Sequence, residues 1–283
     1  MNLSQTLKLL RDKERKSGSR LQSALELKRY REQSKFEIIE KSHAFYLPAV
    51  STHARIKWGC VFIRQIYKFF NLADDQHGPN APVFHVTVAD KSGLTTDQLQ
   101  TINLRCIKRK LASALKGLSY IGMVEPGYFN NAYSEPGDKV KNVVSWHGHF
   151  LVWGVTKKQL AEHLEGIKPR FIPICLRSRP VNKKIIKPEW FGHVLWYLIK
   201  SPCKEYSIGK RSEPEAKTGA ARYKQNLRKI RPGHRVKLFH LMRGMYLDKL
   251  AMAGGEGRKL LQKMKYDALC DYRRHNGWHD YRP

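Results

Sequence analysis

The sequence predicts an α+β fold with a central antiparallel sheet, helices on one face of that sheet, and helical segments at both ends of the chain. Two observations lead to this prediction. Between residues 83 and 200, segments rich in β-branched residues alternate with segments whose apolar residues recur at helical spacing, in the order β-α-β-β-α-β-α. Two of these strands follow one another through a turn-rich loop, and hairpin-linked strands of this kind indicate an α+β sheet with helices on one face.

The chain divides into three predicted regions. Residues 1–78 are expected to be mainly helical, because charged residues alternate there with apolar residues at helical spacing. Residues 74–82 are dense in turn formers and mark the best candidate boundary in the first half of the chain. Residues 79–205 form the predicted sheet domain, and residues 206–283 form a basic, mainly helical C-terminal region.

The elements of the central region follow from local patterns. Thr95 with Gln98 is a capping-box signature for the first helix, which is expected to end near Gly117. Further helices are expected at 156–164 and 188–200. The strands are expected at segments rich in β-branched and aromatic residues, namely 83–89, 120–125, 143–153 and 171–177.

The charge of the chain indicates a polyanionic partner. The 283 residues contain 53 Lys and Arg against 24 Asp and Glu, which gives a formal net charge of +29. Nucleic acid is the commonest partner for such a charge. No stretch approaches the ~18 apolar residues of a membrane span, so no membrane partner is expected. The five cysteines form no CxxC pair, which favours a reducing, cytoplasmic environment.

A pair of histidines in the third strand indicates a metal site. His147 and His149 are two residues apart, so a strand directs both imidazoles to the same face. Glu125 ends the preceding strand, and an antiparallel hairpin could bring its carboxylate to that face. Two imidazoles and a carboxylate suit Mn²⁺ and also Zn²⁺. The alternative is that both histidines are hydrogen-bonded sheet residues.

The helix predicted at 188–200 carries a candidate nucleophile. His193, Tyr197 and Lys200 share one helical face. A phenol has an ordinary pKa near 10, and a nearby ammonium or a metal-bound phosphate would favour the phenolate. Tyr197 is therefore the candidate catalytic nucleophile, with Lys200 as its catalytic partner. The alternative is an amphipathic helix whose tyrosine lies at the rim of the core.

The two patterns together resemble the HUH endonucleases. The segment from Trp146 to Trp153 is similar to the metal motif of that family, 197–200 looks like its catalytic motif, and 83–89 matches its first motif loosely. The order of the motifs resembles the replication-initiator branch, whereas conjugative relaxases place the tyrosine before the histidines. Gly148 is a departure, since the family usually has a bulky hydrophobic residue between the two histidines. The resemblance covers roughly residues 80–205.

The resemblance implies an initiator of rolling-circle replication. His147, His149 and Glu125 would hold Mn²⁺ or Mg²⁺, and Tyr197 would attack the scissile phosphate to give a 5′-phosphotyrosine link and a free 3′-OH. Lys200 would stabilise charge or help to deprotonate the phenol. The implied partners are single-stranded or cruciform origin DNA and a host helicase and polymerase, in the cytoplasm and nucleoid of a bacterium that carries a plasmid or phage.

Other interpretations of the same sequence stay open. Tyr206 is a possible second nucleophile, but Pro202 separates it from the helix of Tyr197, so a single-tyrosine enzyme is favoured. A single-tyrosine transposase of similar chemistry and a non-catalytic nucleic-acid-binding protein are the competing functions. The basic stretch 217–243 is expected to contact phosphates or to be an ordinary solvated face. Its candidate DNA-binding residues are Arg222, Lys224, Arg228, Lys229, Arg231 and Arg235.

Overall fold

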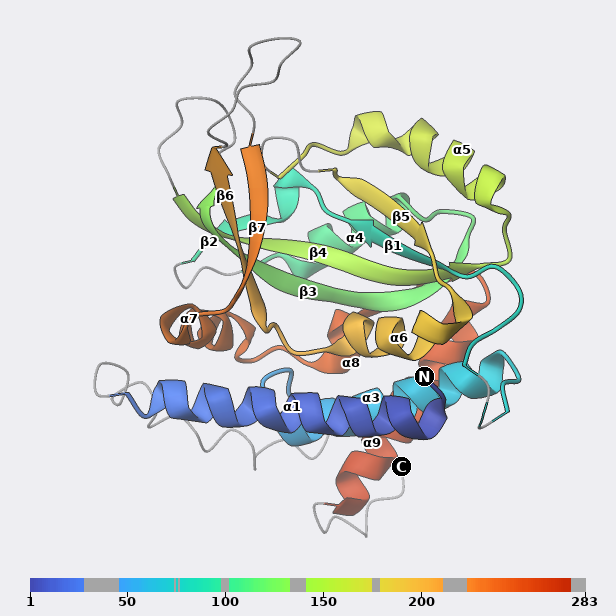
Figure 1. Cartoon of the computed structure of the whole chain (residues 1–283), viewed down its shortest axis with the longest axis horizontal. Coiled ribbons are helices and arrows are strands. Elements are labelled where there is room, and N and C mark those ends of the chain that lie inside the picture. Colours follow the sequence, from blue (N-terminus) through green and yellow to red (C-terminus); the bar gives the residue numbers. More distant parts are fainter. Residues whose placement is uncertain are drawn as a thin grey trace.

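The computed structural model describes residues 1–27, 46–73, 75, 77–97, 102–132, 141–174, 179–210 and 223–275. Within these residues the chain is α+β, with a curled sheet of eight strands in which β5, β1, β4, β3, β6 and β7 are neighbours in that order (Figure 1). Strand β2 also pairs with β4, and β8 also pairs with β3. The strands are β1 (Phe84–Val88), β2 (Leu94–Thr96), β3 (Ser119–Ala132), β4 (Lys141–Trp153), β5 (Val181–Ile185), β6 (Lys204–Lys210), β7 (Tyr223–Lys229) and β8 (Ala251–Gly254).

Eight α-helices and three short 3₁₀ helices are present in the same described residues. The α-helices are α1 (Leu3–Leu25), α3 (Thr52–Phe69), α4 (Leu104–Ser113), α5 (Lys157–Ile167), α6 (Phe191–Ile199), α7 (Pro232–Met242), α8 (Leu247–Leu250) and α9 (Gly257–His275). The 3₁₀ helices are η3 (Lys91–Gly93), η4 (Lys168–Arg170) and η5 (Pro188–Trp190). No helix among these residues is both long enough and apolar enough to cross a bilayer.

The sheet is built around the two long strands β3 and β4, which pair antiparallel as expected. In their register Glu125 lies opposite His147, and Met123 lies opposite His149. Directly opposed residues of an antiparallel pair point to the same face. The first part of β3 pairs with β8 on its other side, whereas its second part pairs in parallel with β6. Strand β3 thus changes its partner along its length, and the sheet curls around it.

Helices cover both faces of the sheet, so the prediction of helices on one face is wrong. On the face of His147 and His149, the indole of Trp58 from α3 donates to the Met123 sulfur of β3 at 3.2 Å. On the opposite face, a Cβ added to Gly148 would lie 3.3 Å from Leu111 of α4. The cause is that β4 carries buried apolar side chains on both of its faces, and each apolar face of a sheet needs a covering layer.

The N-terminal helices hold α6 in place. Helix α1 begins at a capping box formed by Asn2 and Gln5, and it packs against α3 and α6. Glu14 of α1 is buried and accepts hydrogen bonds from the Ser201 backbone N–H, at 2.8 Å, and from its hydroxyl. These bonds secure the chain where α6 ends. Most of the buried apolar side chains form one core to which all three predicted regions contribute, and Ala24, Leu25 and Val236 form a separate small cluster.

Several predicted elements match the structure. The strands expected at 83–89, 120–125 and 143–153 correspond to β1, β3 and β4, and the helices expected at 156–164 and 188–200 correspond to α5 and to η5 with α6. Others are wrong. Thr95 lies in β2 rather than at a helix start, and α4 begins only at Leu104 after an Asn103 cap. Gln98 lies outside the described residues.

Two strand predictions need correction as well. Strand β3 does not end at Glu125, because it runs on through the ProGly pair to Ala132. Residues 171–174 of the strand expected at 171–177 do not form a strand, and residues 175–177 lie outside the described part of the chain. The next strand after α5 is β5, which begins only at Val181. The expectation of a mainly helical C-terminal region is wrong in part, since β6, β7 and β8 belong to the sheet.

A buried carboxylate fixes the start of α7. Glu205 of β6 is only 3% exposed, accepts from the Arg231 guanidinium Nε at 2.8 Å and contacts His234 Nδ1 at 2.7 Å. It also accepts from the Arg231 backbone N–H at 3.1 Å. Burial alone would raise the pKa of Glu205. The hydrogen bonds from His234 and the Arg231 backbone, together with the positive charges of these two side chains, lower it below its ordinary value.

We predict that Glu205→Gln lowers the free energy of unfolding at pH 7 by about 1–3 kcal/mol, because hydrogen bonds to a charged group are removed. A carboxylate with a lowered pKa stabilises the fold above its unfolded-state pKa of about 4.3 and loses this effect as the pH falls. The difference between Glu205→Gln and the original chain should therefore shrink below about pH 4. Urea unfolding at pH 7 and at pH 3.5 measures it. Glu165→Gln, at an exposed site on α5, is the control and should leave the unfolding midpoint unchanged. Identical urea unfolding curves for Glu205→Gln, Glu165→Gln and the original protein would contradict the stabilising role of Glu205.

Candidate metal centre and nucleophile

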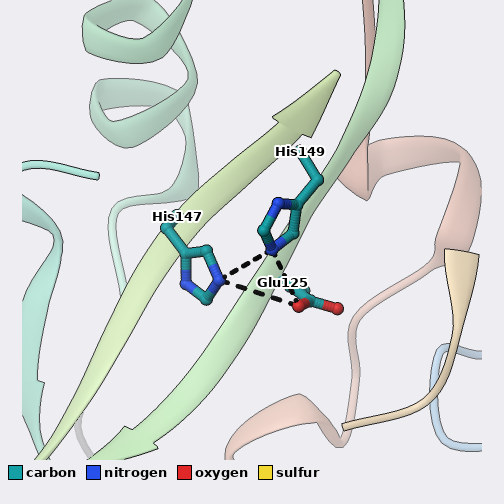
Figure 2. A group of neighbouring side chains, drawn as sticks. All are labelled: Glu125, His147 and His149. Carbon is teal, nitrogen blue, oxygen red and sulfur yellow. Dashed lines mark hydrogen bonds and ion pairs between the residues drawn. The ribbon is translucent and has the colours of Figure 1, made fainter. Parts of the chain in front are cut away.

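The register of β3 and β4 brings the three predicted metal ligands together. Figure 2 shows His147 and His149 on β4 directed toward Glu125 on β3. The Nε2 atoms of the two imidazoles are 3.1 Å apart. The Glu125 Oε1 atom lies 3.1 Å from His149 Nε2 and 3.6 Å from His147 Nε2. All three residues are buried, and their ligand atoms form the group that could hold a metal ion in the described part of the chain.

The outer nitrogens of both histidines have fixed partners. His147 Nδ1 lies 3.0 Å from the Ser145 carbonyl oxygen, which can only accept, so Nδ1 carries the proton and Nε2 keeps its lone pair. His149 Nδ1 lies 3.0 Å from Thr87 Oγ1 and 3.2 Å from His85 Nε2. Such partners orient a metal-ligating imidazole and select its tautomer.

The chemistry of these atoms fits a divalent cation. In the tautomer set by Ser145, the His147 Nε2 atom is an acceptor, and an ionised carboxylate is an acceptor as well. Acceptors that point at one another at about 3 Å repel unless a proton or a cation lies between them. Ligand atoms held at about 2.0–2.2 Å from a divalent ion lie about 3–3.6 Å from one another. The three distances within the cluster fall in this range.

Lys200 neutralises the carboxylate from the other side. Its Nζ atom lies 2.8 Å from Glu125 Oε1 and 2.9 Å from Oε2, and both side chains are buried. Burial alone would raise the pKa of Glu125, but the Lys200 charge holds it well below its usual range. Burial alone would lower the pKa of Lys200, but the Glu125 charge outweighs it and raises that pKa. The pair is therefore ionised, with Lys200 as a fixed cation.

Burial keeps the imidazoles of His149 and His85 uncharged at neutral pH. Burial lowers the pKa of His149 to about 4, and the hydrogen bond to Glu125 offsets only part of this. Burial and the neighbouring His149 lower the pKa of His85 to about 3. Neutral imidazoles are the form in which histidine binds metals.

Tyr197 lies against this cluster, although it is far from it in the sequence. Its ring centroid is 4.9 Å from that of His149 and 5.5 Å from that of His85, in both cases edge to face. The Lys200 Nζ atom lies 4.2 Å from the Tyr197 ring centroid. Burial and the negative charge of Glu125 raise the pKa of the Tyr197 phenol. Its ionisation therefore requires further positive charge near the oxygen.

Tyr206, which the sequence offers as a possible second nucleophile, also lies at the site. It lies on β6, stacks on Phe129 with ring centroids 4.8 Å apart, and forms a hydrogen bond with Tyr197. One straight helix indeed does not present both tyrosines, but a strand presents the second one. His85 and Thr87 were not predicted as site residues, but they have a signal in the sequence: alternation along 83–89 places both on one face of β1.

A cavity of about 990 Å³ opens beside the cluster. His147, His149, Tyr197 and Tyr206 lie in its wall. The rest of the wall comes mainly from β1, β5 and the segment around α6, and in the described part of the chain it contains no aspartate or glutamate. Its further lining residues are His85, Thr87, Ala89, Phe129, Ile174, Arg179, Asn182, Lys184, Ile185, Ile186, Lys187, Trp190, His193, Val194 and Trp196.

The predicted DNA-binding residues are placed unequally. Arg222 and the side chain of Lys224 lie outside the described residues. Arg228 and Lys229 are exposed on β7. Arg231 is exposed but pairs with Glu205. Arg235 is 6% exposed and donates to the Ser17 hydroxyl, so it joins α7 to α1 and is not a surface cation.

A second, basic groove of about 310 Å³ runs between α1 and the β6–β7 pair. Both Lys200 and Trp196 lie in its wall, and Trp196 also lines the cavity of the metal cluster. Glu14 in its wall is already paired with Ser201. Its other charged lining residues are the cations Lys13, Lys16, Arg20, Lys204, Arg228 and Lys229. Four of them were not expected from the sequence, because α1 and Lys204 join Arg228 and Lys229 only through the fold.

Comparisons of the chain with protein-family models, with curated proteins and with solved structures gave no match. The interpretation of the site therefore depends on its geometry.

We predict that the purified protein takes up one divalent ion at this cluster. His147→Ala should weaken binding more than tenfold, because one of three ligands is removed, and Thr87→Val should weaken it by about 10–100-fold through His149. Calorimetric titrations with Mn²⁺, Mg²⁺ and Zn²⁺ measure the affinities. His193→Ala removes an imidazole from the same cavity but not from the cluster, and should bind as tightly as the original protein. Equal uptake by the original protein and His147→Ala would contradict the site.

Proposed function

We propose that the protein is a DNA nickase of the HUH type, in which Tyr197 attacks a phosphodiester beside the Glu125–His147–His149 cluster. The observation that carries the proposal is the contact of the Tyr197 ring with His149, at 4.9 Å between centroids, in a chain with a net charge of +29. The Tyr197 phenol and both imidazoles of a cluster with the donor set of a metal site line one cavity, and the Lys200 ammonium lies 4.2 Å from the centroid of the Tyr197 ring. Together they offer a nucleophile, a Lewis-acid site and charge balance.

The covalent step exchanges one phosphate ester for another. The Tyr197 phenolic oxygen attacks phosphorus and the bond to the 3′ oxygen breaks, which leaves a 5′-phosphotyrosine and, after proton transfer, a free 3′-OH. A divalent ion bound by the cluster, Mn²⁺ or Mg²⁺ in this proposal, would polarise the phosphate. Attack of a 3′-OH on the phosphotyrosine reverses the step and rejoins the strand without ATP.

Lys200 is suited to charge stabilisation rather than to proton removal. Its ammonium is held by both oxygens of Glu125 and lies over the Tyr197 ring. A cation in this position favours negative charge on the phenol and on the phosphate in the transition state. Lys200 therefore acts beside the nucleophile as a fixed positive charge.

The basic groove supports DNA as the substrate. It places cations of α1, β6 and β7 on either side of a channel whose wall shares Trp196 with the cavity. Phosphates bound there would lead a strand toward Tyr197. We infer an initiator of rolling-circle replication acting on single-stranded or cruciform origin DNA in a bacterial cytoplasm. The sequence has no GxxxxGK[ST] phosphate loop, so a host helicase and polymerase would extend the 3′ end.

We predict a covalent protein–DNA adduct that depends on Tyr197. The purified protein is incubated with Mn²⁺ and a pool of single-stranded oligonucleotides of randomised sequence, and adducts that survive denaturing electrophoresis are recovered and sequenced. Tyr197→Phe should abolish the adduct, because the attacking oxygen is removed, and His147→Ala should reduce it at least about 100-fold if charge stabilisation of about 3 kcal/mol disappears. A mass spectrum of the adduct locates the modified residue.

Tyr206→Phe is the matched control, since it removes the other phenol of the same cavity. It should keep the adduct, although loss of its hydrogen bond to Tyr197 would slow formation. An adduct at Tyr206, or one that persists in Tyr197→Phe, would contradict the assignment of the nucleophile. Transfer of the bound strand to a second DNA without replication would favour a transposase, and repeated absence of adducts alongside tight DNA binding would favour a non-catalytic binding protein.

We also predict that the basic groove contributes to the salt dependence of DNA binding. Replacing Lys13, Lys16, Lys204 and Arg228 by glutamine should reduce the slope of log K against log salt by about 0.9 for each phosphate of duplex DNA that is no longer neutralised. Fluorescence anisotropy between about 50 and 200 mM salt measures this slope. Four exposed lysines that line neither cavity, Lys157, Lys158, Lys259 and Lys263, provide the charge-matched control. An equal slope in both variants would show that the groove has no special part in binding.

A further inference from the structure

The wall of the cavity also contains an exposed indole. Trp190, in η5, is 56% exposed, although indoles are usually largely buried. Its ring centroid lies 5.2 Å from that of His193, with the planes tilted by 39°. Ile185 of β5, another residue of the cavity wall, is 53% exposed. An apolar and aromatic surface that stays in water in the wall of a cavity is suited to a flat ligand.

Three cations line the same cavity as this indole. Lys184, Lys187 and Arg179 are exposed and line the same cavity. Among the described residues no acidic side chain in the cavity wall balances them. Their charge therefore favours an anion, and an aromatic face next to several cations is the arrangement by which proteins bind unpaired nucleotides.

The fold connects this part of the cavity wall to the reacting groups. Lys184 on β5 lies opposite His85 on β1, and His85 contacts both His149 and Tyr197. Neighbouring strands are about 4.8 Å apart, so β5 lies about 10 Å from β4. Trp190 immediately precedes α6, the helix that carries Tyr197. If the scissile phosphate of a DNA strand lies at Tyr197, a neighbouring nucleotide of that DNA strand would therefore lie close to the Trp190 indole.

We propose that Trp190, supported by His193, is a stacking platform for one unpaired DNA base close to the scissile phosphate, and that Lys184, Lys187 and Arg179 bind the phosphates beside that base. The inference rests on the proposed function for its position relative to the reaction, but binding itself needs no chemistry. The subsite selects single-stranded DNA, because in a duplex both faces of each base are covered by its stacked neighbours. It would thereby restrict nicking to melted or looped DNA.

The test measures binding apart from catalysis. The affinity of the full-length protein for a single-stranded oligothymidylate of about 15 nucleotides is measured by fluorescence anisotropy in EDTA, next to a duplex of the same length. Trp190→Ala should weaken single-strand binding about 5- to 150-fold, the range for removal of one base–aromatic stack, and Trp190→Phe should retain most of it. Duplex binding should change less than twofold. Replacing Lys184 and Lys187 by glutamine should reduce the single-strand salt slope by about 0.7 for each phosphate that is no longer neutralised.

Tyr266→Ala is the matched control, because Tyr266 on α9 is 64% exposed and lies outside the cavity wall. It should bind as the original protein does. Single-strand affinity of Trp190→Ala within twofold of the original, or an equal decrease for duplex DNA, would overturn the stacking platform. Melting temperatures of all variants are compared, and Trp190→Phe separates loss of the ring from loss of folding.

The outcomes also separate this inference from the proposed function. If Trp190→Ala forms covalent adducts normally and binds single-stranded DNA as tightly as the original protein, the stacking platform is contradicted and the proposed nickase activity is not. The predicted decrease of single-strand affinity in a protein that never forms an adduct would leave a single-strand-binding site without the nickase.

Discussion

A buried carboxylate on a central strand sets the conditions for the rest of the structure. Glu125 lies in the middle of β3, where an ionised group without partners would be strongly unfavourable. Lys200 supplies the counter-charge from the end of α6, and the two imidazoles of β4 supply the remaining contacts. The strand register and the position of α6 must therefore both be correct for the carboxylate to be tolerated. The same requirement brings Tyr197 to the histidines, because Tyr197 and Lys200 are on consecutive turns.

The surrounding helices can be understood as supports for this arrangement. Glu14 of α1 binds the first residue after Lys200, and Arg55 of α3 donates hydrogen bonds to the carbonyl oxygens of Ala49 and Ile199. Both contacts secure the end of α6 from the side opposite the sheet. A site built on a strand pair and a helix held at its end keeps its side chains in defined positions, which the proposed reaction would require.

The sequence could predict the parts of the site that depend on local periodicity. Alternation along β4 predicts that His147 and His149 lie on one face of the sheet, and helical spacing predicts that Tyr197 and Lys200 lie on one face of α6. It could not show that Tyr206 shares the cavity, because β6 pairs in parallel with β3 and no local pattern encodes that contact. The strands of the C-terminal region were missed for a related reason. Strands β6 and β7 are rich in charged residues, and their partner strand rather than their composition decides their structure.

The bond between Glu14 and Ser201 has a consequence for any attempt to shorten the protein. A fragment limited to residues 79–205 would contain every ligand and the Tyr197 phenol, yet it would lack α1 and α3 and with them one whole side of α6. The Ser201 amide would then lose its partner Glu14, and the Phe191 ring would lose its contacts with the rings of Tyr67 and Phe70. The smallest unit that preserves the candidate site is thus set by the contacts that hold one short helix, and it extends well beyond the motifs that contain the site residues.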